Sequence, residues 1–140
     1  MFKKSITLVA MLSLLLSLPV LCADAADTAA DVTKATYLEA EMAAADFDAQ
    51  INIDGYVILD FYADWCPPCK RLIPIFTKLA SQYPNIRFIK VNVDSKRDLV
   101  GRYGIRSMPT LIVLQNGAEI KRHVGFMNEQ MLINWLASYA

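Results

Sequence analysis

Residues 56–63, with the sequence YVILDFYA, form an apolar run in which Asp60 is the only charged residue. A strand without an alternating polar row is typical of a sheet that is covered on both faces. Cys66 and Cys69 follow closely, and a helical pattern begins behind them. The run therefore predicts an α/β domain in which helices flank a central β-sheet.

The segment after the cysteines predicts an amphipathic helix. Its apolar residues recur at helical spacing on one side, and polar residues occupy the other side. Pro74 lies inside the pattern, removes a backbone donor and is expected to bend the helix. The apolar residues are Leu72, Ile73, Phe76, Leu79, Ala80 and Tyr83.

The rest of the chain alternates between strand and helix patterns. Residues 86–94 alternate apolar residues with Lys90 and Asn92, as in a strand. Asn116–Gly117 is a strong signal for a two-residue hairpin turn between two strands. Asn128 is a candidate cap for a last helix, whose inward side would hold Met131, Leu132, Trp135, Leu136 and Tyr139.

The predicted order of elements is β-α-β-α-β-α-β-β-α. Alternating strands and helices give parallel pairing, and the final hairpin adds antiparallel strands to the same sheet. The fold class is therefore α/β with a central mixed β-sheet flanked by helices. The predicted elements lie in residues 36–51, 56–63, 66–83, 86–94, 95–104, 110–124 and 128–139.

The N-terminus has the order of a secretory signal peptide. Two lysines precede an apolar run over residues 6–21, and small residues follow it. We expect cleavage after Ala25, a flexible lead-in over residues 26–35 and a domain over residues 36–140. An uncleaved membrane anchor is one alternative, although the run is shorter than the roughly 20 apolar residues that span a bilayer. Lipid modification of Cys22 is the other alternative.

Export determines how the cysteines are read. Cys22 would leave with the signal, so the exported domain would keep Cys66 and Cys69 in a compartment that favours disulfides. The whole chain has 14 Lys and Arg residues against 14 Asp and Glu residues, without a block of one sign. This balance gives no indication of binding to nucleic acid or to a lipid surface.

The spacing of Cys66 and Cys69 admits three kinds of site. A zinc site needs four ligands, and the exported domain adds only the distant His123, which is expected to face solvent from a strand. A structural disulfide closing so short a loop would restrict the unfolded chain little. A reversible dithiol fits best, because a helix N-terminus stabilises a thiolate, the species that attacks disulfides.

Three further features accompany the cysteines. Asp60 is either an acid at a strand edge that reaches water, or a buried acid with a raised pKa that exchanges a proton with Cys69. Lys90 is either the partner of Asp60 or an exposed strand residue. Pro109, after Met108, either occupies the permitted first position of a strand or follows a cis peptide bond.

These motifs resemble the thioredoxin family from about Phe47 to the C-terminus. The resemblance rests on VILDFYADWCPPCKRLIPIF, KVNVD, YGIRSMPTLIVLQNG and VGF, in this order and at similar spacing. It implies the thioredoxin fold and a redox-active Cys66–Cys69 disulfide, with Cys66 as nucleophile and Cys69 as resolving cysteine. It also implies that Asp60 transfers protons beside Lys90 and that Pro109 is cis. The implied substrate groove consists of Trp65, Pro67, Pro68, Met108, Pro109 and Gly125.

Three residues depart from the usual family pattern and bear on redox potential and substrate preference. Pro67 takes the place of a glycine in the spacer, Tyr62 replaces a common tryptophan, and Ser107 replaces a common glycine. Pro67 deletes an N–H near Cys66, which should leave the thiolate less stabilised and the pair a weaker oxidant.

The sequence therefore predicts a monomeric protein-disulfide reductase that is exported to the periplasm and uses neither a cofactor nor a metal. Its clients would be proteins with disulfides, and its electrons would come through a membrane-embedded donor. An oxidase or isomerase of the same fold is one alternative, and a non-enzymatic binding factor is the other.

Overall fold

The computed structural model describes residues 37–39 and 44–139, and the expected signal peptide, its expected cleavage site, Cys22 and the expected lead-in lie outside these residues. The observed elements follow the predicted β-α-β-α-β-α-β-β-α order. They are β1 (Tyr37–Glu39), α2 (Ala44–Ile51), β2 (Tyr56–Tyr62), α3 (Pro67–Gln82), β3 (Ile86–Asn92), α4 (Arg97–Arg102), β4 (Thr110–Gln115), β5 (Ala118–Val124) and α5 (Glu129–Leu136).

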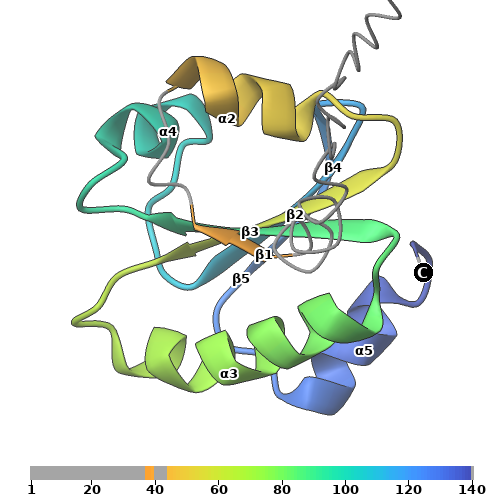
Figure 1. Ribbon diagram of the computed structural model, residues 1–140. Helices are drawn as coiled ribbons and strands as arrows, with labels where there is room; N and C mark the ends of the chain where they lie inside the picture. The colour runs from red at the N-terminus through yellow and green to blue at the C-terminus, as the bar shows by residue number, and fades with distance from the viewer. Residues whose placement is uncertain (1–36, 40–43, 140) are drawn as a thin grey trace, which may run out of the picture.

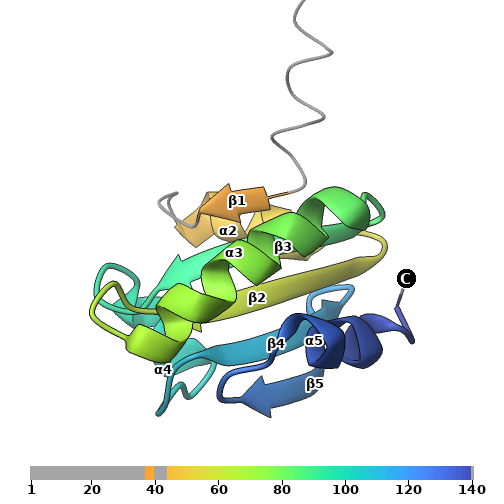
Figure 2. The same ribbon diagram turned by 90° about the horizontal axis from the view of Figure 1, so that it is seen from below.

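The strands form one mixed sheet in the order β1-β3-β2-β4-β5. β3 pairs in parallel with both β1 and β2, whereas β4 is antiparallel to β2 and β5. Helices α3 and α5 cover one face of the sheet, and α2 and α4 cover the other (Figure 1). Seen from the α3 side, α3 crosses β3 and β2 while α5 lies over the β4–β5 half (Figure 2). The predicted mixed sheet between helices is confirmed.

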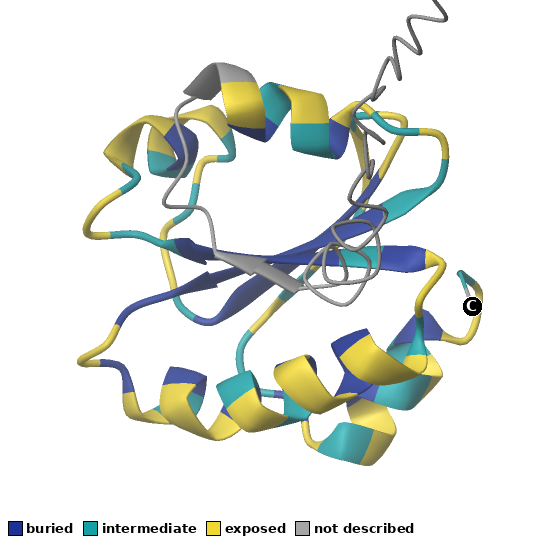
Figure 3. Cartoon of the chain, in the orientation of Figure 1, coloured by how far each residue is buried: buried dark blue, intermediate teal, exposed yellow. Residues whose placement is uncertain are grey.

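Each face of the sheet has its own apolar core, because successive side chains of a strand point to opposite faces. Ile58 of β2 packs with Leu72 and Phe76 of α3, while Leu59 packs with Phe47 of α2 and its neighbours. Burial therefore runs unbroken along β2 from Val57 to Tyr62, as its apolar sequence predicts (Figure 3).

Strand β3 departs from the predicted alternation. Its apolar residues divide between the two cores, with Phe88 on the α3 side and Ile89 and Val91 on the α2 side. Lys90 is only 7% exposed, so β3 has no solvated face. The reason is its position between β1 and β2, with helices above and below.

Turn and cap signals are confirmed. Asn116 and Gly117 both have positive φ, 51° and 77°, as a two-residue hairpin between β4 and β5 requires. The side chain of Asn128 accepts a hydrogen bond from the Met131 N–H at 2.9 Å and caps α5. Met131 itself is 47% exposed, so its predicted inward position is wrong.

No helix within residues 44–139 combines the length and the apolar character needed to cross a bilayer.

Candidate active site

Cys66 and Cys69 form a disulfide at the N-terminus of α3. Strands β2 and β3 both end on this side of the molecule, and α3 begins there (Figure 1). Cys66 is the N-cap residue, and Pro67 and Pro68 are the first two residues of the helix, with Cys69 third. The two Cα atoms are 5.3 Å apart. The pairing that the resemblance implied is therefore present.

The prolines limit which backbone donors surround the Cys66 sulfur. The Cys66 N–H donates to the Ala63 carbonyl, and the Lys70 N–H donates to the Cys66 carbonyl, each at 3.1 Å. Pro67 and Pro68 have no N–H. The Cys69 amide is thus the one N–H left among the first three helical positions, where an ordinary helix offers three.

The disulfide is almost closed to solvent. Cys66 is 4% exposed and Cys69 is fully buried. The Cys66 sulfur lies 3.8 Å from the carbonyl oxygen of Met108, whose peptide bond to Pro109 is cis. The N–H of Gly125 donates to the Pro109 carbonyl at 2.8 Å, which ties the loop after β5 to the loop before β4. Of the implied groove residues, Met108 therefore lies at the disulfide, and Pro109, the next residue in the chain, is joined to Gly125.

The rest of the implied groove is open to solvent. Trp65 is 64% exposed, Pro67 is exposed and Pro68 is partly buried. The Trp65 indole N–H donates to Asp94 at 2.9 Å, just beyond β3. Sequence reasoning missed this partner of Trp65. A usable signal existed, since Asp94 follows one parallel strand as Trp65 follows the next, and such ends lie side by side.

Asp60 lies in the interface between β2 and α3. Its neighbours on the same strand face, Ile58 and Tyr62, pack against α3 and the cysteines respectively. The carboxyl group is fully buried, and neither oxygen has a hydrogen-bond partner among the described residues. Burial raises the pKa of Asp60 to about 7. The acid at a strand edge that reaches water is excluded.

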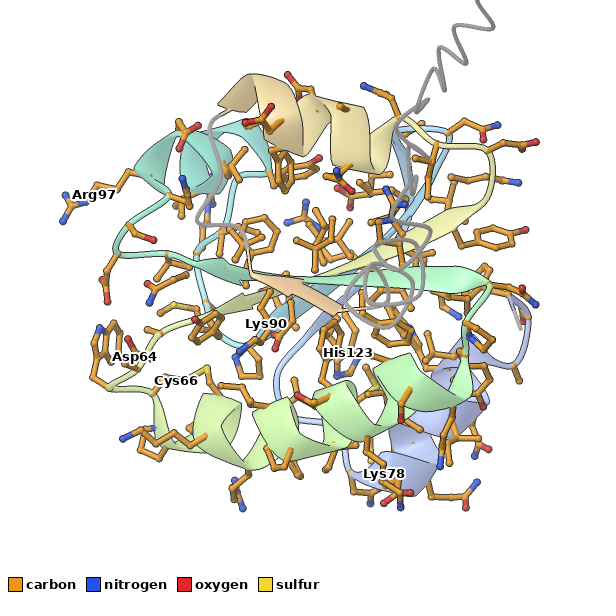
Figure 4. All side chains as sticks on the ribbon, in the orientation of Figure 1. Asp64, Cys66, Lys78, Lys90, Arg97 and His123 are labelled. Atoms are coloured by element: carbon orange, nitrogen blue, oxygen red, sulfur yellow. A yellow bond between two sulfur atoms is a disulfide. The ribbon has the colours of Figure 1, made fainter. Side chains whose placement is uncertain are left out.

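Lys90 lies directly across from Asp60 in the β2–β3 register. Its ammonium lies 5.3 Å from the centroid of the Tyr62 ring, and burial lowers the pKa of Lys90. The alternative that Lys90 is an exposed strand residue is therefore wrong. Lys90 is a neighbour of Asp60, but the carboxyl group accepts no hydrogen bond from it. The positions of Lys90 and Cys66 are labelled in Figure 4.

We expected His123 to face solvent, and this prediction is wrong. It lies on β5, is partly buried and meets the Trp135 ring edge-on, with the ring centroids 6.4 Å apart. Because His123 is in register with Leu111, its side chain points to the sheet face that α5 covers. Within residues 37–39 and 44–139 no three His, Cys, Asp or Glu side chains gather as metal ligands.

Comparison with known proteins agrees with this geometry. The family profile described as Thioredoxin matches residues 39–138. The thioredoxin of Mycoplasma genitalium is 46% identical over 78 residues, which are 56% of this chain and 76% of the relative. Thioredoxin-1 of Saccharomyces cerevisiae is 42% identical over 82 residues, covering 59% of this chain and 80% of the relative.

A solved structure shares the fold as well. A mutant thioredoxin from Halobacterium salinarum superposes with a TM-score of 0.68 at 32% sequence identity. The match covers 76% of this chain and 93% of that protein.

Proposed function

The chain belongs to the thioredoxin family and is a thiol–disulfide oxidoreductase, and from this premise we propose that it reduces protein disulfides outside the cytoplasm. The observation that carries the direction is the pair of prolines behind Cys66. With the N–H groups of both positions missing, the Cys66 thiolate loses donors that would stabilise the reduced pair. A less stabilised dithiol gives up its electrons more readily.

The proposed reaction is a two-step exchange. The Cys66 thiolate attacks one sulfur of the client disulfide, forming a mixed disulfide and releasing the other client sulfur as a thiol. Cys69 then attacks the Cys66 sulfur, which releases the second client thiol and leaves the Cys66–Cys69 disulfide. Asp60 accepts the proton of Cys69, since a carboxyl group with a pKa of about 7 suits this transfer near neutral pH.

Lys90 is assigned a positioning role in this scheme. It faces Asp60 across the strand pair and brings a cation near a buried acid. Trp65, Pro67, Pro68, Met108, Pro109 and Gly125 form the proposed groove, which accepts an extended client segment.

The location rests on the N-terminal sequence. Lys3 and Lys4, the apolar residues 6–21 and the small residues around Ala25 support export to the periplasm. Outside the membrane no thiol pool supplies electrons, so a membrane-embedded donor would reduce the Cys66–Cys69 disulfide again. We propose that the domain works as a monomer.

The test combines client trapping with a redox titration. In Cys69→Ser the second step is blocked, so mixed disulfides between Cys66 and client proteins should accumulate in cell extracts. Cys66→Ser should trap nothing and should abolish turnover. The reduction potential of the native pair should lie near the roughly −270 mV of thioredoxins rather than the roughly −120 mV of strong oxidants.

The alternatives give different results. A potential near that of the strong oxidants would reject the reductase in favour of an oxidase or isomerase. Full function of Cys66→Ser in the cell would instead identify a binding factor that uses the groove without the cysteines.

A further inference from the structure

A pocket of about 320 Å³ opens beside the active site, between the end of β3, α4 and the loop that leads to β4. Its apolar wall is formed by Val93, Val100, Ile105 and Met108. A wall of this kind accommodates an aliphatic or aromatic side chain.

Two contacts place this pocket next to the disulfide. Met108 contributes to the apolar wall, and its carbonyl lies 3.8 Å from the Cys66 sulfur. Asp94, which also lines the pocket, holds the Trp65 indole. An extended chain advances about 3.3 Å per residue. A client segment joined to Cys66 would therefore present the residues within a few positions of its cysteine to this pocket.

The charged groups around the pocket differ in whether they have an interaction partner. Arg97 and Arg106 line it and are exposed, and their side chains have no hydrogen bond, ion pair or ring contact with any described residue. Arg97 extends toward solvent on the same edge of the molecule as Asp64 and Cys66 (Figure 4). The carboxylate of Asp94 is engaged by Trp65.

The other arginines of the described chain are all engaged. Arg87 bonds Gln50, Arg102 bonds Asp48, Arg122 bonds Glu119, and Arg71 lies over the Phe126 ring. Among the described residues, the guanidinium groups that lack a partner thus gather at the pocket beside the disulfide.

We propose that this pocket selects clients in which an apolar side chain and neighbouring carboxylates lie close to the reactive cysteine. The inference rests on the proposed function, whose client class it specifies. The apolar side chain enters between Met108 and Val100, and the client carboxylates meet Arg97 and Arg106. Guanidinium groups suit this task, because their planar N–H pairs match a carboxylate.

The experiment uses three disulfide-linked peptides that are identical except beside one cysteine. The first carries Leu-Glu-Glu there, the second Leu-Gln-Gln and the third Ser-Glu-Glu. The native protein should give kcat/KM values about fivefold higher for the first peptide than for the second at low salt, as expected for two exposed ion pairs. The third peptide should fall below the first, and added salt should reduce the preference.

The variant Arg97→Gln/Arg106→Gln should bring the ratio between the first two peptides close to one. Arg102→Gln is the control, since it removes one positive charge from α4 at a residue that does not line the pocket, and it should retain the native ratio. Thermal unfolding verifies that each variant is folded.

Equal native rates for the first two peptides, or a ratio retained in the double variant, would overturn the pocket assignment while leaving the reductase intact. If the protein reduces no peptide but oxidises their dithiol forms with the same acidic preference, the proposed direction fails and the pocket assignment stands.

Discussion

Asp60 is the residue whose chemistry conflicts most with its surroundings. Its carboxyl group is fully buried without a hydrogen-bond partner among the described residues, and its pKa is about 7 instead of the ordinary 3.8. The folded chain therefore binds this proton more tightly than the unfolded chain. Its contribution to the free energy of unfolding is fully present below about pH 4. That contribution is lost as the pH rises through 7, when the buried group ionises.

Replacing this acid should stabilise the oxidised protein at alkaline pH. Three pKa units correspond to about 4 kcal/mol. At pH 8 the free energy of unfolding of Asp60→Asn should therefore be higher than that of the native protein by up to about that amount. Urea unfolding between pH 4 and pH 8 measures the effect. The exposed Asp54→Asn is the control and should keep the native pH dependence. An unchanged slope in Asp60→Asn would show that another group titrates.

At the scale of elements, the start of α3 determines how the cysteines react. Cys66 caps the helix, and N-cap side chains most often accept hydrogen bonds from the second or third helical N–H. Pro68 has no N–H at the second helical position, and Pro67 has none at the first. The partial positive charge at a helix N-terminus resides largely on its free N–H groups. At α3 few of these groups are present to stabilise a Cys66 thiolate.

Restoring these donors should make the pair more oxidising. Pro67→Gly/Pro68→Ala adds N–H groups at both positions, and one charge-assisted hydrogen bond should lower the pKa of the Cys66 thiol by about one unit. The reduction potential should rise by about 30 mV, since the added bond stabilises the reduced state. Thiolate ultraviolet absorbance and glutathione titration measure the two effects.

Pro74→Ala is the control for this pair of substitutions. It also removes a proline from α3, but in the helix interior and away from the cysteines. It should change stability without changing the thiol pKa. Equal shifts in both variants would attribute the effect to helix stiffness rather than to the donors near Cys66.

Local patterns predicted the elements well, while contacts between elements escaped them. The strand at residues 56–63, the helix behind the cysteines, the Asn116–Gly117 turn and the Asn128 cap each depend on neighbouring residues, and all are confirmed. The burial of Lys90 and the covering of His123 by Trp135 depend on which strands and helices become neighbours in space. The same holds for the bond from Trp65 to Asp94, whose partners are 29 positions apart.

Most of the apolar packing of the molecule lies away from the reactive cysteines. Two apolar cores lie on opposite faces of the sheet, whereas the disulfide, Trp65 and the pocket lie at one end, where β2 and β3 finish. Lys78 of α3 pairs with Glu129 of α5 and links the two helices that cover the Asp60 face. Substitutions at the reactive end therefore leave most of both cores intact.

The proposed location also concerns the whole chain, and the mature N-terminus tests it. When the full chain is produced in a Gram-negative host, the periplasmic fraction should contain a protein that begins at Ala26 by mass spectrometry. Leu15→Arg places a charge in the apolar run and should keep the chain in the cytoplasm. An uncleaved chain in the membrane fraction would indicate the anchor, and a mass increase at Cys22 would indicate lipidation.

The closeness of the two buried cysteines has a consequence for how the protein withstands oxidation by peroxide. In the reduced protein, a peroxide that reaches Cys66 converts its thiolate to a sulfenic acid. Cys69 is fully buried one helical turn away, with the Cα atoms 5.3 Å apart, so its thiol would attack that sulfur and expel water. The product would be the ordinary Cys66–Cys69 disulfide, which the donor proposed above would reduce. Oxidative damage at this site thus ends in a state of the normal catalytic cycle, short of the irreversible sulfinic acid.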